Sequence, residues 1–415
     1  MIQTCPRAVV RAPPRVSISQ ASAAHVIADF MNNCCKAGGT NAKAFAREHD
    51  LMNVLALCSY PIEAAATRYR VAQFIAPLRE RGIEVTVRPL LDGRTFAALY
   101  RRAEWPRTTA ALAAAALRRV ADVWRARKFD AVFVQREALM VGPPLVEWLT
   151  TRAQGRPLIL DLDDATYVRY VSQSYGRLGG ALKWFGKTDE LIRWASVVTC
   201  GNRFIAEYVE AKGARATVIP TVVDTDLFRP AQPPHAHDAP VVGWIGTHST
   251  YAYLETIFPV LQTLAREFRF RLKIIGGRER VNLPGVEVEN LPWALAREVA
   301  DFQSLDIGLY PLGLNASSPR AWLVGKSGFK AIQYMAVGAP FVVTPVGVCA
   351  EIGAAGVTHL TAETPDEWHA ALARLLTDEH MRHTLGARGR QHALDHYALP
   401  AQADKLAAAL RAALK

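Results

Sequence analysis

Residues 323–347, LVGKSGFKAIQYMAVGAPFVVTPVG, decide the fold class. Apolar residues in the first part of this stretch recur at helical spacing and predict an amphipathic helix over 325–337. A Gly-Ala-Pro break follows, and then a short apolar strand begins. A helix followed at once by a short, wholly apolar strand is typical of a parallel sheet that is covered by helices on both faces.

The same alternation of strands and helices runs along most of the chain, in two blocks. Apolar strands such as NVLALCS, FDAVFVQRE, VVGWIG and DIGLYPL separate the expected helices. In the first block these helices are 68–82, 108–128, 143–152, 182–195 and 203–213, and in the second block they are 252–267, 294–304, 325–337 and 365–378. The pattern predicts an α/β protein with two facing, doubly wound, Rossmann-like domains.

The domain boundaries follow from this rhythm and from a Pro-rich break. We expect an N-terminal extension at 1–51, a first domain at 52–229, a linker at 230–240, a second domain at 241–395 and a C-terminal helix at 396–415 that crosses back to the first domain. Residues 1–51 lack the alternation, and we interpret them as a disordered extension or as the product of a start codon assigned too far upstream. Two such domains leave an interdomain cleft between the carboxyl ends of their strands, where ligands bind in this class.

Composition excludes several classes of protein. The six cysteines form no Cys-x-x-Cys pair, which argues against a zinc site or a disulfide framework and favours reduced, cytoplasmic thiols. No apolar run reaches the ~20 residues of a membrane span. The net charge is +11, and residues 67–128 hold 14 Lys or Arg against five Asp or Glu. These cations form either solvated helix faces or a surface for anionic lipid or a phosphorylated acceptor; no nucleic-acid motif accompanies them.

The letters Gly-Lys-Ser at 325–327 match the end of a phosphate-binding P-loop. A P-loop needs a glycine five residues before Gly325, directly after a buried strand, but Arg320 stands there and no strand precedes it. The stretch still offers phosphate chemistry, because a helix N-terminus attracts anions. On the expected helix Lys326 and Lys330 are four residues apart, and Gln333 continues the same face.

Several segments together resemble the GT-B glycosyltransferases, specifically their family-4-like group of retaining, nucleotide-sugar-dependent enzymes. The similarity lies in QYMAVGAPFVVTPVG, ADFQSLDIGLYPL, GNRFIAEYVE and VIPTVVDTDLFRP, and it covers about 52–400. The resemblance implies that the second domain binds a nucleoside-diphosphate sugar and that the first domain binds the acceptor. It also implies that neither a cofactor nor a metal is required.

The sequence departs from the family pattern at three places. Gln333 stands where the family has the second glutamate of its motif, and Gly325 stands where it has the first. The family's diphosphate-binding Arg and Lys are replaced by the small residues of GWIGTHST. The donor-binding residues that we expect are Gly246, Thr247, His248, Lys326, Ser327, Lys330 and Gln333.

Polar residues at three strand ends of the first domain are the candidates for the acceptor side. They are Arg136, Glu137, Asp161 and Asn202, together with Asp163 and Asp164 as candidate catalytic bases. Asp163 and Asp164 could instead cap the following helix. A metal role for Asp-x-Asp-Asp is also chemically open, although the resemblance implies none.

The resemblance implies a hexosyltransferase-type enzyme that uses a glycan or lipid-linked acceptor. We expect it to work in cell-envelope polysaccharide or glycolipid synthesis, in the cytoplasm and peripherally on the inner membrane face. Two alternatives share the fold: a non-catalytic nucleotide-sugar-binding protein and a nucleotide-sugar epimerase. A dinucleotide-dependent oxidoreductase is disfavoured, because no Gly-x-Gly-x-x-Gly follows any strand.

Overall fold

A computed structural model describes residues 51–99, 105–169, 182–232, 238–247, 250–277, 280–313 and 319–415. Residues 46–415 belong to one compact unit. Apart from Leu51, the expected extension at 1–51 lies outside the described residues.

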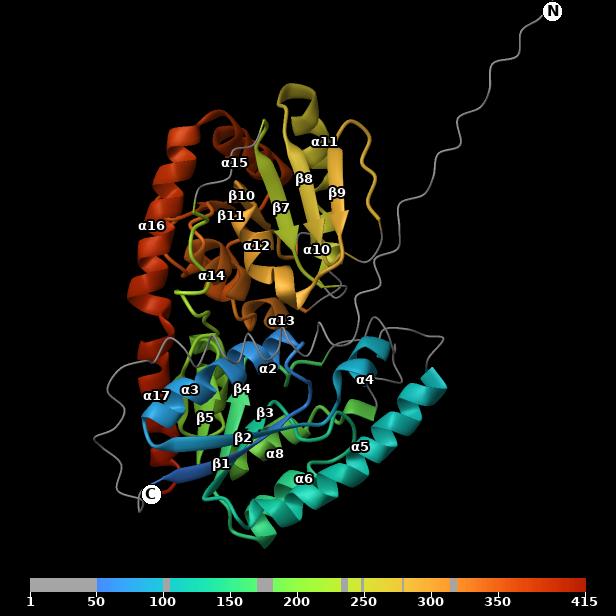
Figure 1. Ribbon diagram of the computed structural model, residues 1–415, viewed down its shortest axis with the longest axis vertical. Coiled ribbons are helices and arrows are strands. Elements are labelled where there is room, and N and C mark those ends of the chain that lie inside the picture. The colour runs from blue at the N-terminus through green and yellow to red at the C-terminus, as the bar shows by residue number, and fades with distance from the viewer. Residues whose placement is uncertain are drawn as a thin grey trace, which may run out of the picture. The chain divides into compact units, whose positions relative to one another are not determined.

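The first sheet has six parallel strands in the order β2-β1-β3-β4-β5-β6 (Figure 1). The strands are β1 (Met52–Cys58), β2 (Ile83–Pro89), β3 (Ala131–Gln135), β4 (Leu158–Leu162), β5 (Val197–Cys200) and β6 (Ala216–Val218). The α-helices between them are α2 (Ala65–Arg70), α3 (Ile75–Glu80), α4 (Gly93–Ala98), α5 (Trp105–Ala126), α6 (Leu145–Trp148), α8 (Lys187–Trp194) and α9 (Arg203–Ala211). Strands β3, β4 and β5 are buried along their whole length, which explains their unbroken apolar sequence.

The second sheet repeats this plan in the order β12-β11-β10-β7-β8-β9, again with parallel pairing. Its strands are β7 (Val241–Ile245), β8 (Arg271–Ile275), β9 (Glu287–Leu291), β10 (Ile307–Tyr310), β11 (Phe341–Val343) and β12 (Leu360–Thr361). Its helices are α10 (Tyr251–Glu255), α11 (Phe258–Glu267), α12 (Glu298–Gln303), α13 (Arg320–Val324), α14 (Phe329–Ala336) and α15 (Pro365–Thr377). The expected pair of doubly wound α/β domains is therefore confirmed.

Two C-terminal helices connect the domains. Helix α16 (Glu379–Tyr397) packs beside α14, where a side chain on Gly386 would meet the carbonyl oxygen of Gly338 at 2.1 Å. Helix α17 (Leu399–Ala412) then returns to the first domain, and Leu406 and Leu410 share a buried cluster with strand β1. The expected return of the C-terminal helix is confirmed.

Several of the expected helices are interrupted, and proline accounts for two of the breaks. The helix expected over 68–82 is divided among α2, a 3₁₀ turn (Ala72–Phe74) and α3, because Pro77 has no N–H to continue the ladder of hydrogen bonds. The helix expected over 252–267 breaks before Pro259, which lies in the first turn of α11. No helix of the described residues is long and apolar enough to cross a membrane.

A later helix start corrects the prediction for the opening stretch. Helix α14 begins at Phe329, not at 325, because Gly328 takes the left-handed conformation (φ 64°) that starts the helix anew after α13. Lys326 therefore lies in the loop between the helices. The prediction that Lys326 and Lys330 share one helical face is wrong.

Candidate functional site

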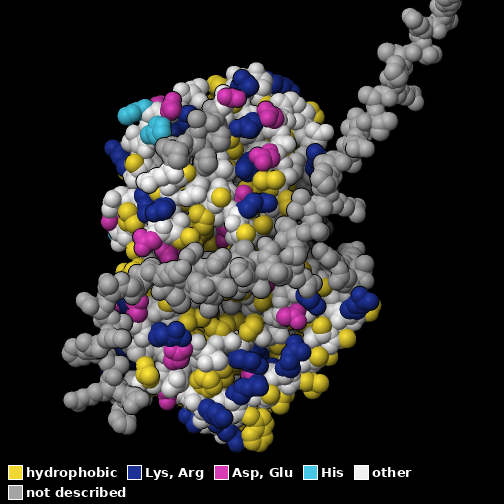
Figure 2. Space-filling view, viewed as in Figure 1, with side chains coloured by type: hydrophobic (Ala, Val, Ile, Leu, Met, Phe, Trp, Pro, Cys, Tyr) yellow, Lys and Arg dark blue, Asp and Glu magenta, His cyan; other side chains and the backbone are white. Residues whose placement is uncertain are grey.

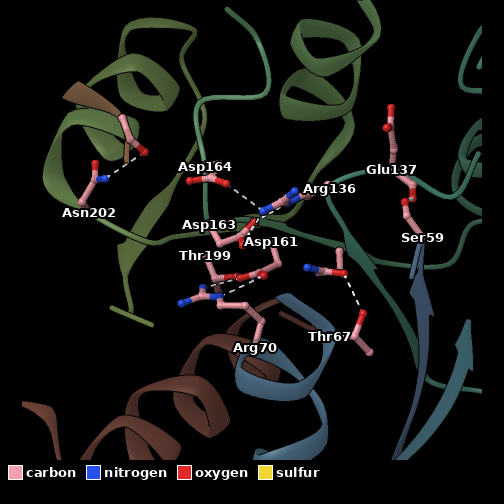
Figure 3. A network of polar contacts seen from close by, with 12 residues as sticks. Ser59, Thr67, Arg70, Arg136, Glu137, Asp161, Asp163, Asp164, Thr199 and Asn202 are labelled. Carbon is pink, nitrogen blue, oxygen red and sulfur yellow. Dashed lines mark hydrogen bonds and ion pairs between the residues drawn. The ribbon is translucent and has the colours of Figure 1, made fainter. Parts of the chain in front are cut away.

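Arg136 organises the carboxyl edge of the first sheet, where β3 and β4 end (Figure 3). Its guanidinium donates to Asp163 Oδ2 at 2.6 Å and to Asp164 Oδ2 at 2.9 Å. Its backbone has φ 63°, a conformation that non-glycine residues rarely adopt. The surrounding contacts hold this strained residue in place, as is common at functional sites.

Asp163 and Asp164 differ in what they can do chemically. Burial alone would raise the pKa of Asp163, but the charge and hydrogen bonds of Arg136 lower it below its ordinary value. A carboxylate held in this way is a weak base, so Asp163 becomes a poor candidate for proton abstraction. The Asp164 side chain is 17% exposed and makes a single bond to Arg136, which leaves it the better candidate. Residues 165–169 form turns and no helix, so neither aspartate caps a helix in this described segment.

Asp161 does not face an acceptor, which corrects the prediction. It is 1% exposed, and both carboxylate oxygens are bound by the guanidinium of Arg70. Thr199 donates a further bond at 2.6 Å. Since breaking a buried ion pair leaves an uncompensated charge, these three residues fix the positions of α2, β4 and β5.

Glu137 is also occupied. Its carboxylate pairs with the buried Lys187 of α8 at 2.6 Å, and its backbone carbonyl accepts a bond from Ser59. These contacts tie the end of β3 to α8. The acceptor contact of Glu137 stays a prediction.

Asn202 links the two domains. Its Oδ1 accepts from the Ile205 amide and caps α9, while its Nδ2 donates to the carbonyls of Gly325 at 3.2 Å and Lys326 at 3.0 Å. The residue is 2% exposed, so an acceptor cannot reach it. The prediction of an acceptor contact is corrected: Asn202 positions the loop that carries Lys326.

The structure explains the glycine at 325. A Cβ on Gly325 would lie 2.3 Å from Cβ of Ala165, directly after the Asp163–Asp164 pair. Any side chain at 325 would therefore push the two domains apart or displace the 163–165 loop. A glutamate at 325 would not fit this close approach.

The 326–333 segment brings cations and an unpaired amide to the same place. Lys330 is half-buried, its ammonium lies 5.5 Å from the centre of the Tyr310 ring, and Lys326 lies over Trp322. Burial, with a smaller contribution from the charge of Lys326, lowers the pKa of Lys330 to about 8, and Asp164 opposes the shift. The close approach of Gly325 to Ala165 brings the loop after Asp164 next to the loop that carries Lys326.

Gln333 lies on the first turns of α14 and is 3% exposed. Its buried Nε2 has no hydrogen-bond partner among the described residues. An unpaired buried donor costs ~1–3 kcal/mol, so this amide is free to donate to a ligand oxygen. Ser327 lies in the loop before α14 and is partly exposed.

The remaining donor candidates follow β7. The Gly246 amide continues the ladder by donating to Ile275 at 3.0 Å, and a Cβ on Gly276 would meet the Gly246 carbonyl at 2.3 Å. Thr247 is exposed, and its amide donates to Thr250 Oγ1 at 3.1 Å. His248 lies outside the described residues. Small residues are therefore required where the turns after β7 and β8 touch.

An interdomain ion pair escaped the sequence analysis. Glu298 accepts two bonds from Arg68, at 2.9 and 3.0 Å, and one from Tyr69 at 2.6 Å. Its partners are about 230 residues away in the chain, and no local pattern signals such a contact. Tyr310, which ends β10 under Lys330, was also missed, although its position at a strand end was a usable signal.

Among the described residues there is no group of three or more His, Cys, Asp or Glu side chains that could hold a metal ion. The absence of a metal requirement stays a prediction.

Comparison with known proteins agrees with this geometry. Residues 239–378 match the family model described as glycosyl transferases group 1. No curated protein sequence matches the chain. Among solved structures, sucrose-phosphate synthase from Thermosynechococcus elongatus is similar with a TM-score of 0.63 and 15% identity, covering 87% of this chain and 98% of its own.

Two further structures show the same likeness. Anabaena HepE in complex with UDP-glucose has a TM-score of 0.61 and 15% identity, over 87% of this chain and 99% of its own. A glycosyltransferase from Rickettsia africae ESF-5 has a TM-score of 0.61 and 12% identity, over 88% and 100%. Such identities establish a shared fold. The chain thus has the GT-B fold, and residues 239–378 within its second domain are similar to the group 1 glycosyltransferases.

Proposed function

We propose that this protein transfers a sugar from a nucleoside-diphosphate sugar to an acceptor hydroxyl, at a site built from Asp164 of the first domain and Lys330 and Gln333 of the second. One observation carries the proposal. Lys330 is a half-buried cation with no carboxylate within salt-bridge distance among the described residues, and it lies three residues before the unpaired amide of Gln333. A buried cation of this kind is stabilised by an anionic ligand.

The proposed reaction breaks the bond between the anomeric carbon and the diphosphate oxygen and forms a bond from that carbon to the acceptor oxygen. The acceptor proton leaves with the diphosphate or passes to a carboxylate. Lys330 and Lys326 neutralise the charge that develops on the diphosphate, and a preorganised site of this kind supplies a large part of catalysis. Gln333 contributes an amide for the hydroxyls of the nucleoside, and Asp164 is the candidate to accept the proton or to bind the sugar.

The finer assignments follow from family resemblance. We propose a hexosyl group, retention at the anomeric carbon, and a glycan or lipid-linked acceptor in cell-envelope synthesis on the cytoplasmic side. UDP is the first nucleotide to test, because Anabaena HepE was solved with UDP and with UDP-glucose. The binding-protein and epimerase alternatives share the donor site and differ in what happens to the bound sugar.

A donor screen tests the proposal. The full chain is incubated with UDP-, GDP- and ADP-sugars, with and without a glycan and lipid extract, and free nucleoside diphosphate is measured. We expect one donor to release nucleotide only when extract is present. Lys330→Ala should abolish this release, while Lys405→Ala, an exposed lysine on α17, should not. Binding without release under every condition would favour the binding protein, and a changed sugar that stays on the nucleotide would favour the epimerase.

A further inference from the structure

Helix α5 has two apolar faces, and only one of them is buried in the protein. The buried face is fixed by Arg119, which is 1% exposed and donates to the carbonyls of Cys58 and Arg88 at 2.8 Å and to Asp122 at 3.0 Å. These bonds determine how the helix is rotated. The opposite face is therefore a true outer surface.

That outer surface carries an apolar stripe along about four turns of the helix. Its residues recur every three or four positions and are all exposed: Ala110, Ala113, Ala114, Leu117, Val120, Ala121 and Trp124. Leu117 is 75% exposed and Trp124 is 64% exposed. An ordinary surface helix would present polar side chains at these positions, so the stripe needs a partner.

Helix α6 extends the stripe. A bond from Gln154 to the Val123 carbonyl, at 3.0 Å, ties the segment after α6 to α5, and Leu145 and Trp148 are both about half exposed. We call Leu117, Val120, Trp124, Leu145 and Trp148 the α5–α6 face. Together with Val141, Leu182 and Trp184 they make up eight of the twelve exposed large apolar side chains in the described part of the chain.

Basic residues predominate around this face. Arg107, Arg118, Arg125, Arg127 and Lys128 are exposed at its borders, whereas Asp122, the one acid within α5, is 3% exposed on the buried side. In Figure 2, hydrophobic and basic side chains alternate at the lower end of the view, where Figure 1 places α5 and α6.

A basic hollow adjoins the same face. Arg152 follows Trp148 by one helical turn and lines a hollow of about 670 Å³ together with Arg193, Lys212, Arg215 and Lys415. No acidic residue lines it, and among these five cations Lys212 is paired, with Asp189 at 2.8 Å. Positive charge therefore continues past the end of the apolar stripe.

We propose that the α5–α6 face binds the surface of an anionic phospholipid bilayer. Leu117, Trp124 and Trp148 would enter the boundary between headgroups and acyl chains, and the bordering arginines would contact lipid phosphates. A second copy of this chain fits less well, because pairing two such faces would bring their arginines together while helix α5 itself exposes no acid to neutralise them.

Vesicle binding by the full chain tests this surface. It requires neither donor nor acceptor, so its failure would leave the sugar-transfer proposal untouched. We expect the protein to float with vesicles of phosphatidylcholine mixed with phosphatidylglycerol, to bind vesicles of phosphatidylcholine alone much more weakly, and to dissociate as salt is raised. The double variant Leu117→Asp/Trp124→Asp should lose at least about tenfold in affinity for the mixed vesicles.

The control variants distinguish loss of apolar insertion into the bilayer from loss of electrostatic attraction and from unfolding of the protein. Val357→Asp adds an acid at an exposed valine of the second domain and should bind like the parent. Arg118→Gln/Lys128→Gln should weaken binding by about 30-fold, because each basic residue near the surface contributes similarly. Circular dichroism and thermal melting of all variants should match the parent, since each changed residue is exposed.

Three results would overturn the proposal. The first is that the parent protein does not bind anionic vesicles. The second is that Leu117→Asp/Trp124→Asp binds them with the affinity of the parent. The third is a concentration-dependent dimer, seen by light scattering, that this double variant dissolves without any effect on vesicles; the face would then join two copies of the chain.

Discussion

Replacing Lys330 by methionine should make the protein more stable and less able to bind nucleotide. Methionine is unbranched, keeps most of the length of the side chain and removes the charge. Burial disfavours the ammonium and lowers the pKa of Lys330 from 10.5 to about 8. The buried charge therefore destabilises the folded protein when no ligand is bound. Removing this charge should increase the free energy of unfolding and lower the affinity for nucleotide.

The magnitude follows from that pKa. A depression from 10.5 to about 8 corresponds to about 3 kcal/mol of unfolding free energy, and solvent screening of a half-buried group reduces this to about 2 kcal/mol. The charged form is the one disfavoured by folding, so the penalty is complete below pH 8. It fades between about pH 8 and 10.5, because the folded protein then has a neutral Lys330 while the unfolded chain is still protonated.

Urea unfolding at several pH values measures this difference. Lys330→Met should be about 2 kcal/mol more stable than the parent at pH 7, and the gap should close toward pH 10.5. Lys405→Met, at an exposed position of α17, should show no gap. Calorimetry with UDP should show an affinity loss of about 10- to 150-fold for Lys330→Met, the value of one charge-assisted hydrogen bond. Equal stability at pH 7, or a gap that does not change with pH, would refute the reasoning.

Three other changes test neighbouring contacts. UDP binding near pH 8 should take up a proton, because an anion raises the depressed pKa of Lys330. Calorimetry in buffers of different ionisation enthalpy measures this uptake. If no proton is taken up, the assignment of Lys330 to the phosphate site is contradicted. Gly325→Ala should destabilise the protein by ~1–3 kcal/mol in urea, and adding Ala165→Gly should recover most of that loss, whereas an unrescued variant would show that the 2.3 Å approach is not the cause. Asn202→Ala should cost ~1–3 kcal/mol of stability and also raise KM for the donor, because a cap and two interdomain bonds are lost; a stability loss with unchanged KM would limit Asn202 to folding.

The strands and the two-domain plan were predictable because they depend on local pattern. The unbroken apolar runs in β3, β4 and β7 reflect burial on both faces, which the sequence displays directly. The exclusion of a P-loop also depended on local sequence. Among the residues that the structure describes, no strand lies between β10 and α13, so the strand that a P-loop needs is absent there. The start of α14 was mispredicted because a glycine in the left-handed conformation leaves little trace in a hydrophobic pattern.

The candidate site was less predictable, since it depends on contacts between distant residues. Asp161 looked like a surface carboxylate, but Arg70 reaches it from 91 residues away. The sequence suggested that Asn202 contacts the acceptor, but its amide donates to the carbonyls of Gly325 and Lys326, 123 and 124 residues further along the chain. Lys330 and Gln333 lie on one helix, α14, as the spacing predicted, and their role in donor binding stays a prediction.

The most direct test of sugar transfer is a mass measurement on the acceptor. The full chain is incubated with the donor that releases nucleotide in the screen, and the acceptor fraction is analysed by mass spectrometry. The account predicts that one acceptor gains the mass of a single hexose residue, with an equimolar amount of nucleoside diphosphate released, and that Lys330→Met loses both signals while Lys405→Met keeps them. Nucleotide binding with no mass gain on any acceptor, or a mass gain unaffected by Lys330→Met, would contradict it.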